Sequence, residues 1–490
     1  MNFWQKYKPF TELALSLAKK AGASYADIRI IESQGQSIAT KNKDLNSINE
    51  YVNAGFGIRV IYNGGWGFAS SNVLSNESIA KTVELAISIG KASSLFKEKI
   101  SLAPEPIHVT RYTSPCKTDP FSIPLERKIN ELIAASSLAL NVKGITLTLG
   151  HMHFIKTKQI FASLEGSYIE QTFIKSSCGL DVHATKDGDQ QNRSYPNSFG
   201  GQWELAGYEL IERLDLKSHA AKIASQAVEL LTAKPCPTGN RDIIIGSSQL
   251  GLQIHESCGH PSELDRALGE EINYAGDSFL KLALLNKLKY GSPIINLFAD
   301  ATIPHGLGSF GFDDEGVMAQ KFDLVKDGIF CNYLASRELA GSIGLKRSNG
   351  CMRSQSWNYT PIIRMTNICL EPGRDKLSLD DLIGDTKNGI YMETNKSWSI
   401  DQKRYNFQFS TQIAWEIKDG KLGQILKNPS YGGITSEFWN SCDAICDDSE
   451  YIVWGVPNCG KGQPSQTMWT GHGASPARFR NIKVGIAHKV

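Results

Sequence analysis

The sequence has almost no net charge and no long apolar run. Its 52 Lys and Arg residues are balanced by 50 Asp and Glu residues, which gives a formal net charge of +2, and the basic residues are scattered. Nucleic-acid binding through phosphate contacts needs a basic patch, so a direct nucleic-acid function is not expected. No apolar run approaches the roughly 20 residues that span a membrane, so we expect no membrane partner.

The ten cysteines follow no regular spacing. This pattern differs from that of a disulfide-stapled secreted domain. The first 22 residues carry charges within an amphipathic pattern and lack the unbroken apolar core of a signal peptide. These features predict a cytoplasmic protein with reduced thiols. Cys442 and Cys446 form a lone CxxxC pair, for which a structural role is favoured over a metal or redox role.

The chain is long enough for two domains with large cores. It has 490 residues, of which 41% are hydrophobic and 21% are charged, as in ordinary globular proteins. The segment KPCPTGN interrupts the pattern near residues 233–239. We therefore predict an N-terminal domain over residues 1–232 and a C-terminal domain over residues 233–490.

The order of predicted helices and strands indicates an α+β fold rather than a doubly wound parallel sheet. In the first half we predict helices at 10–21, 75–92, 124–140 and 203–231, strands at 25–31, 38–52, 55–61 and 145–183, and a loop at 187–201. In the second half we predict strands at 241–245, 294–299, 322–333, 389–392 and 405–419. We expect an N-terminal domain with an antiparallel sheet, and a C-terminal domain whose strands form a barrel- or sandwich-like sheet.

The segment 245–265 carries the clearest chemical signal. It reads IGSSQLGLQIHESCGHPSELD and contains His255, Glu256 and His260 in an HExxxH pattern. Zinc peptidases with an HExxH helix use the same three side chains, because two imidazoles hold the metal and the carboxylate takes a proton from water. The spacing here is one residue longer, so the motif alone is a weaker signal than HExxH.

The longer spacing predicts a distorted helix. At about 100° per residue, positions i and i+5 lie about 140° apart and do not share a face. A wide π-type turn would bring His255 and His260 together. A break at Gly259 would do the same, and Pro261 favours a break because the residue before a proline avoids helical dihedrals. In either case the distortion should lie between Glu256 and His260.

A third ligand must come from elsewhere, because catalytic zinc usually has three protein ligands and one open position. Cys258 lies inside the motif, where ligation from the same tight turn would crowd the metal, and a core role is favoured. Cys459 stands far downstream in WGVPNCGKGQPSQ, among glycines that permit a close backbone approach. His305 and His472 are competing candidates.

Two further groups of polar residues are weaker candidates. His151 and His153 lie two apart on a predicted strand and would share a face, but a solvated or core pair is favoured over a metal site. Asp313, Asp314 and Glu315 form an acidic cluster. The cluster could orient a ligand histidine or bind a peptide N-terminus, and a solvated turn is an equal alternative.

Segments along nearly the whole chain resemble one known family. GASYADIRI and GIRVIYNGGWGFAS are similar to its N-terminal domain, and HESCGHPSELD to its HExxxH segment. DATIPHGLGSFGFDDEGVMAQKFDLVKDGIFCNYL and IIRMTNICLEPG are similar to its C-terminal domain, and VPNCGKGQPSQ to the segment with its zinc-binding cysteine. The family is that of the TldD/PmbA zinc metallopeptidases, also called modulators of DNA gyrase. Ser257, Cys258 and Pro261 depart from its usual pattern around the second histidine.

The resemblance implies a Zn²⁺ ion held by His255, His260 and Cys459, with Glu256 as general base. It also implies a dimer, either of two copies or with a metal-free relative, and a peptide that enters a cavity between the subunits as an extended strand. The metal-free branch of the family lacks HExxxH, so the motif is typical of the TldD-like side.

Three functions are therefore weighed. The favoured one is a zinc-dependent metallopeptidase that hydrolyses unfolded or extended peptides in a cavity formed by a dimer. The alternative is a non-catalytic, zinc-stabilised binding or regulatory protein of the gyrase-modulator kind. A cysteine hydrolase that pairs Cys258 or Cys459 with a histidine is the third.

Overall fold

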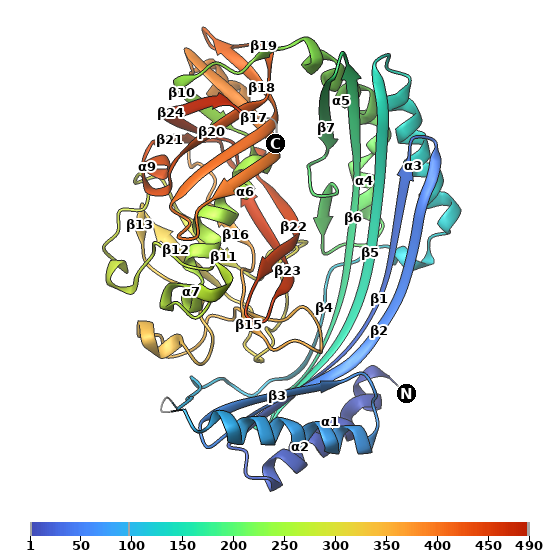
Figure 1. Cartoon of the computed structure of the whole chain (residues 1–490), viewed down its shortest axis with the longest axis vertical. Coiled ribbons are helices and arrows are strands. Elements are labelled where there is room, and N and C mark those ends of the chain that lie inside the picture. Colours follow the sequence, from blue (N-terminus) through green and yellow to red (C-terminus); the bar gives the residue numbers. More distant parts are fainter. Residues whose placement is uncertain (1, 97–98, 488–490) are drawn as a thin grey trace.

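Four long antiparallel strands organise the N-terminal half of the computed structural model, which describes residues 2–96 and 99–487. They are β1 (Tyr25–Lys41), β2 (Asp44–Tyr62), β5 (Ile145–Ser163) and β6 (Tyr168–Lys186), and they pair in the order β2-β1-β5-β6. The shorter strands of this sheet are β3 (Gly65–Ser71) beside β2, and β4 (Val109–Thr113), β7 (Asp189–Tyr195) and β8 (Gln202–Glu204) beside β6. Figure 1 shows the long strands arching along one side of the molecule.

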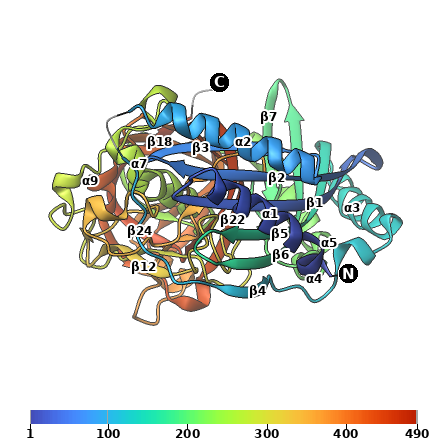
Figure 2. The same cartoon turned by 90° about the horizontal axis from the view of Figure 1, so that it is seen from below.

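Helices cover the two ends of this sheet and form two separate cores. Near one end lie α1 (Phe3–Lys20) and α2 (Asn76–Ser93), and near the other lie α3 (Leu125–Leu140), α4 (Glu209–Leu214) and α5 (Leu216–Thr232). Figure 1 shows these two groups apart from each other, and Figure 2 shows α1 and α2 lying over β1, β2 and β3. The opposite face of the sheet is concave, and the C-terminal half of the chain lies against it (Figure 1).

A closed barrel of five strands forms the second sheet. Its strands follow the order β17-β10-β24-β20-β18, and pairing of β17 with β18 closes it. The strands of this sheet are β9 (Lys234–Pro235), β10 (Gly239–Ile245), β17 (Asn388–Ile400), β18 (Asn406–Lys418), β19 (Lys421–Lys427), β20 (Pro429–Ile434), β21 (Cys442–Ile445) and β24 (Ala477–Ile486). Closure leaves these five strands without an exposed edge.

Smaller sheets, hairpins and helices complete the C-terminal half. A four-stranded sheet contains β11 (Leu297–Asp300), β12 (Lys321–Lys326), β13 (Ile329–Phe330) and β16 (Ile368–Leu370), and two hairpins pair β14 (Met352–Arg353) with β15 (Ile362–Ile363) and β22 (Ile452–Lys461) with β23 (Gln466–Ala474). The helices of this half are α6 (Ser247–Ile254), α7 (Leu264–Leu268), α8 (Leu379–Gly384) and α9 (Thr435–Asn440). The hairpin β22–β23 packs against α6 and brings distant residues to it.

The predicted fold class is confirmed: the protein is α+β, with an antiparallel N-terminal sheet and a barrel in the C-terminal half. The motif helix α6 begins at Ser247, and the side chain of Ser75 caps α2. None of the helices in the described ranges is long and apolar enough to cross a membrane.

Three element predictions were wrong. The strand predicted at 38–52 contains a turn at Asn42, where a positive φ of 58° separates β1 from β2. The loop predicted at 187–201 contains β7, which pairs with β6. The helix predicted at 203–231 is broken, because residue 203 belongs to β8 and Asp215 has a φ of 41° between α4 and α5. In each case an asparagine or aspartate with a positive φ turns the chain and ends an element.

Candidate metal centre

The HExxxH segment forms a π-helical turn at the end of α6. The turn spans His255–Gly259, and the N–H group of His260 donates to the carbonyl of His255, five residues earlier. The predicted distortion between Glu256 and His260 is confirmed, and it is the wide turn rather than a break. His260 keeps helical dihedrals (φ −60°, ψ −46°) although Pro261 follows it, so the expected effect of the proline was wrong. The π-turn turns both imidazoles to one side.

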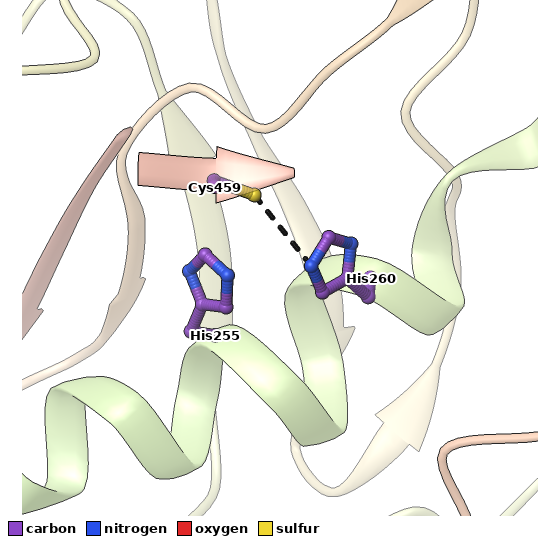
Figure 3. A group of neighbouring side chains, drawn as sticks. All are labelled: His255, His260 and Cys459. Atoms are coloured by element: carbon purple, nitrogen blue, oxygen red, sulfur yellow. Dashed lines mark hydrogen bonds between the residues drawn. The ribbon is translucent and has the colours of Figure 1, made fainter. Parts of the chain in front are cut away.

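Two imidazoles and one thiol meet above this turn. Ligand atoms of His255, His260 and Cys459 all lie within 4.8 Å of one another, and all three residues are buried. The Cys459 Sγ lies 3.5 Å from the His260 Nε2. Figure 3 shows Cys459 on β22 facing the two rings, which rise from the helical turn below it.

The hydrogen bond between His255 and His472 leaves the Nε2 atom of His255 free to bind a metal ion. Its Nδ1 lies 2.7 Å from the Nε2 of His472, and the Nδ1 of His472 lies 3.2 Å from the carbonyl oxygen of Ile368. A carbonyl only accepts, so His472 carries its proton on Nδ1 and accepts the Nδ1 proton of His255 on Nε2. This assignment leaves the Nε2 lone pair of His255 unused.

A buried carboxylate orients His260 in the same way. The His260 Nδ1 lies 3.0 Å from the Oε2 of Glu263, so its proton is donated to the carboxylate and Nε2 faces Cys459. Glu263 is fully buried and lies 3.3 Å from the Nε of Arg266 and 3.6 Å from the Nζ of Lys461. These cations hold the carboxylate in place, which is how proteins fix metal-binding histidines.

The surroundings of Cys459 favour the thiolate form of its side chain. Burial opposes ionisation, yet the neighbouring imidazoles of His255 and His260 hold the pKa of Cys459 well below its ordinary value. Burial also opposes protonation of His255, but the thiolate raises the pKa of that imidazole. Burial lowers the pKa of His260 well below its ordinary value. A metal ion requires a thiolate and neutral imidazoles, so its binding would displace the proton that the thiolate favours on His255.

These donors fit a tetrahedral metal ion. Bonds of about 2.0–2.3 Å from zinc to nitrogen and sulfur place neighbouring ligand atoms about 3.5 Å apart, which is the separation between Cys459 and His260. Two imidazoles with one thiolate are ligands that zinc accepts, and a site with three protein ligands leaves a fourth position for water or substrate. The cluster can therefore hold a metal in a catalytic arrangement.

Glu256 lies in the same turn and is held by an arginine. Its Oε2 accepts a hydrogen bond from the Nη1 of Arg404, a residue with a φ of 64° in the connection between β17 and β18. The Nε of Arg404 is buried and has no hydrogen-bond partner among the described residues. A buried guanidinium donor without a partner is costly, so this N–H group near Glu256 is an unsatisfied donor.

The competing candidates lie elsewhere. Cys258 packs in the hydrophobic core, as predicted, and the Nδ1 of His305 contacts the carbonyl of Leu205. His472 lies behind His255 rather than beside Cys459. All ten cysteines are free, including the CxxxC pair.

The two weaker candidate groups have structural partners. His151 contacts Asp181 at 3.2 Å, and His153 stacks on Trp203. The acidic cluster at 313–315 is buried rather than solvated, and it contacts Arg29 and Arg59 of β1 and β2. It lies at the contact between the two halves of the molecule.

Sequence reasoning missed Arg404 and Glu263, and it named His472 as a competing ligand rather than as the partner of His255. Glu263 lies three residues after His260, a spacing that would have suggested a contact. No local pattern marks Arg404 or the contact of His472 with His255, because these positions near the motif arise from the folding of the β17–β18 connection and of β23.

Family models and relatives match the chain over most of its length. Residues 238–485 match the PmbA/TldA metallopeptidase C-terminal domain, and residues 26–90 match domain 1 of the same family. A metalloprotease of Methanocaldococcus jannaschii is 32% identical over 450 residues, which cover 92% of this chain and 95% of the relative. A zinc metalloprotease TldD homolog of Saccharolobus solfataricus is 23% identical over 477 residues, 96% of this chain and 98% of the relative.

Solved structures share the fold at low sequence identity. A Thermotoga maritima protein described as a proposed modulator of a DNA gyrase has a TM-score of 0.78 at 17% identity, covering 98% of this chain and all of that one. TldE from Thermococcus kodakarensis has a TM-score of 0.71 at 17% identity, covering 97% of this chain and 100% of that one. At this identity the likeness concerns the fold alone.

Proposed function

Because this chain belongs to the PmbA/TldA metallopeptidase family, we propose that it is a zinc-dependent peptidase that hydrolyses unfolded or extended peptides in a cavity formed by a dimer. One observation carries the proposal: the two imidazoles of the π-turn and the distant thiolate of Cys459 converge, with the carboxylate of Glu256 in the same turn. The ligands would be His255, His260 and Cys459.

The residues of the site have separate tasks. When bound, zinc would supply Lewis acidity toward a peptide carbonyl and toward water. Glu256 is the group that accepts a proton from the attacking water and returns it to the leaving amine. The bond from Arg404 holds its Oε2, which leaves Oε1 as the oxygen that takes the proton.

Arg404 has a second role in the proposed reaction, as a hydrogen-bond donor to the substrate. Its buried Nε has no partner in the described part of the chain, and its charge influences the pKa of both His255 and His260. The guanidinium is therefore close to the ligands as well as to Glu256. In the proposed reaction this N–H donates to the carbonyl oxygen of the substrate, on which negative charge develops.

A free strand edge supports the proposal of a dimer. From Phe56 onward β2 pairs with β3, but its first part, residues 44–55, pairs only with β1 within the described residues. Leu45, Tyr51 and Val52 are exposed there, with 82% of Val52 accessible. Proteins rarely leave an apolar strand edge open to water, so a second subunit or an extended peptide is expected to cover it.

The decisive test replaces the proposed base and one proposed ligand. We expect Glu256→Gln to retain about one zinc per chain but to lower peptide hydrolysis by at least about 100-fold, because the proton acceptor is lost. Cys459→Ser should lose the metal as well as the activity. Elemental analysis measures the metal, and mass spectrometry of a flexible peptide measures the cleavage.

Five outcomes would contradict parts of the proposal. Unchanged turnover in Glu256→Gln would refute the assigned base, and a wild-type protein that binds zinc but cleaves no peptide would favour a binding protein. Activity that survives chelation by EDTA would favour a cysteine hydrolase. Equal cleavage of a folded domain and a flexible peptide would contradict an enclosed cavity, and a monomeric mass in solution would contradict the dimer.

A further inference from the structure

A second cavity, distinct from the three-residue cluster, lies between the N-terminal sheet and the C-terminal half. It has a volume of about 270 Å³. One face of β1, β2, β5 and β6 forms its floor, and segments 307–312, 353–356 and 467–469 supply the opposite wall. His255, His260 and Cys459 are not among its lining residues.

The floor of the cavity carries one cation, Lys175 of β6. Gln171, Phe173 and Lys175 alternate along the strand and all line the cavity, as side chains on one face of a strand do. The Lys175 Nζ lies 5.0 Å from the ring centroid of Trp469 and 5.8 Å from that of Phe173. Within the described residues Lys175 has these ring contacts but neither a hydrogen bond nor an ion pair.

The opposite wall carries a second cation, Arg353 of β14. Its Nη1 donates to the carbonyl oxygens of Met365 and Trp469, at 2.9 and 2.7 Å. Both acceptors are neutral, and Arg353 forms no ion pair with a carboxylate in the described part of the chain. Burial, with the charge of Arg353 as the second cause, lowers the pKa of Lys175 to about 7. The cavity therefore contains two basic groups that form no ion pair with a carboxylate among the described residues, and a bound anion would favour the protonated form of Lys175.

The carboxylates that line the cavity already have partners. Asp314 accepts hydrogen bonds from the N–H group of Ser354 at 2.7 Å and from Gln159 at 2.8 Å, and it pairs with Arg29. Asp313 accepts from three backbone N–H groups. Neither carboxylate contacts Lys175, so an anion from outside would complete the charge balance of the cavity.

We propose that this cavity binds a carboxylate that is attached to an apolar side chain, as at the C-terminus of a peptide. Lys175 and Arg353 provide the cationic contacts, since a guanidinium and an ammonium are the usual partners of a carboxylate. Phe173, Phe310 and Trp469 provide apolar walls, which favour a ligand with an apolar body over a bare inorganic anion.

One hairpin connects the cavity to the metal centre. Met468 lines the cavity and lies opposite Cys459 across the β22–β23 pair. A hydrogen bond joins Arg353 to the carbonyl oxygen of Met365, and the sulfur of Met365 packs against Gly259 of the π-turn. The assignment of the carboxylate to a peptide rests on the proposed function, and a C-terminal anchor here would favour peptides with a free C-terminal carboxylate.

Calorimetric titration of the full-length protein tests the binding site directly. We expect N-acetyl-L-phenylalanine to bind at least about tenfold more tightly than N-acetyl-L-phenylalaninamide, because the amide lacks the charge. Acetate and inorganic phosphate should bind more weakly than N-acetyl-L-phenylalanine. Equal binding of the acid and its amide would overturn the proposal. Tighter binding of acetate or phosphate than of N-acetyl-L-phenylalanine would show that the apolar walls of the cavity do not contribute to binding.

Two substitutions assign the binding to this cavity. Lys175→Met should abolish the preference for the acid over the amide, whereas Lys175→Arg should keep it. Lys186→Met, at the exposed end of the same strand, is the matched control and should bind like wild type. A preference that persists in Lys175→Met would place the carboxylate elsewhere, at the metal for instance, and would contradict the assignment.

Cleavage measurements then separate this proposal from the proposed function. The ratio of kcat/KM for a peptide with a free C-terminus to that for the amidated peptide should exceed about ten in wild type and fall to about one in Lys175→Met. If neither peptide is cleaved while the acid still binds, the hydrolase proposal fails and the carboxylate site stands. If both are cleaved equally by wild type, the C-terminal anchor is refuted.

Discussion

At the scale of single residues, the second partners of the two histidines decide what the site can bind. The Nδ1 of His260 faces the carboxylate of Glu263, and that of His255 faces the neutral ring of His472. Both contacts turn an Nε2 lone pair toward Cys459. A carboxylate partner also makes an imidazole a stronger electron-pair donor to a metal. The affinity of the site for a metal should therefore depend on Glu263, although Glu263 is not itself a ligand.

We therefore expect Glu263→Gln to lower zinc affinity by about 10–100-fold, because glutamine can still accept the Nδ1 proton of His260 but carries no charge. Competition with a chromophoric chelator measures the affinity, and circular dichroism checks the fold. Glu229→Gln on the distant helix α5 is the control. Wild-type affinity in Glu263→Gln would show that the charge of this carboxylate does not support the metal.

At the scale of elements, one wide turn brings the two histidines to the same side. It depends on close packing at Gly259, where a Cβ atom would lie 2.1 Å from the Sδ of Met365. The φ of Gly259 is −58°, so an alanine there would meet a steric conflict but no backbone strain. The glycine is thus needed for the approach of Met365 and not for its conformational freedom.

Gly259→Ala should destabilise the protein by about 1–3 kcal/mol, as overpacking of a core does, and weaken zinc binding by shifting His260. Denaturant unfolding and metal titration measure the two effects. Gly384→Ala, at a helical position with nothing within 4 Å of the added atom, is the matched control. Met365→Ala in the same chain should restore part of the loss, and additive effects of the two changes would show that they do not conflict.

At the scale of the whole molecule, two buried ion pairs and one partly exposed pair join the arched sheet to the C-terminal half. Arg29 contacts Asp314 at 3.3 Å, Arg59 contacts Glu315 at 3.5 Å, and Arg337 reaches Glu165 at 2.7 Å. Burial lowers the pKa of Arg29, and Asp314 opposes that effect. A buried charge is tolerated only beside its partner, so these pairs set the position of one half against the other.

Loss of one partner at this contact should be costly. We expect Asp314→Asn to lower the free energy of unfolding by about 3–5 kcal/mol, because Arg29 would stay buried without a counter-charge. The exposed pair of Lys81 and Glu77 supplies the control, since Glu77→Gln should change stability by less than about 0.5 kcal/mol. Denaturant unfolding followed by circular dichroism compares them. A small effect of Asp314→Asn, no larger than that of the control, would mean that water solvates Arg29.

Local sequence signals predicted the elements that depend on neighbours in the chain. The strand character of β1 and β6, the helix α2 and the distortion of the HExxxH helix follow from residues a few positions apart. The helix predicted at 203–231 failed because its apolar pattern continues across Asp215, where a left-handed backbone ends α4. Periodicity describes which side of an element is buried, and it does not report such a single dihedral change.

By itself, the sequence determined the chemistry of the centre: two imidazoles and a carboxylate within six residues, and a cysteine in a recognisable distant segment. Only the tertiary structure decided what surrounds them. Arg404 reaches Glu256, His472 reaches His255, and Lys175 faces Arg353 across a cavity because separate strands fold against one another. The physical reason is that spacing within one turn is set by the local backbone, whereas contacts between residues far apart in the chain arise from packing alone.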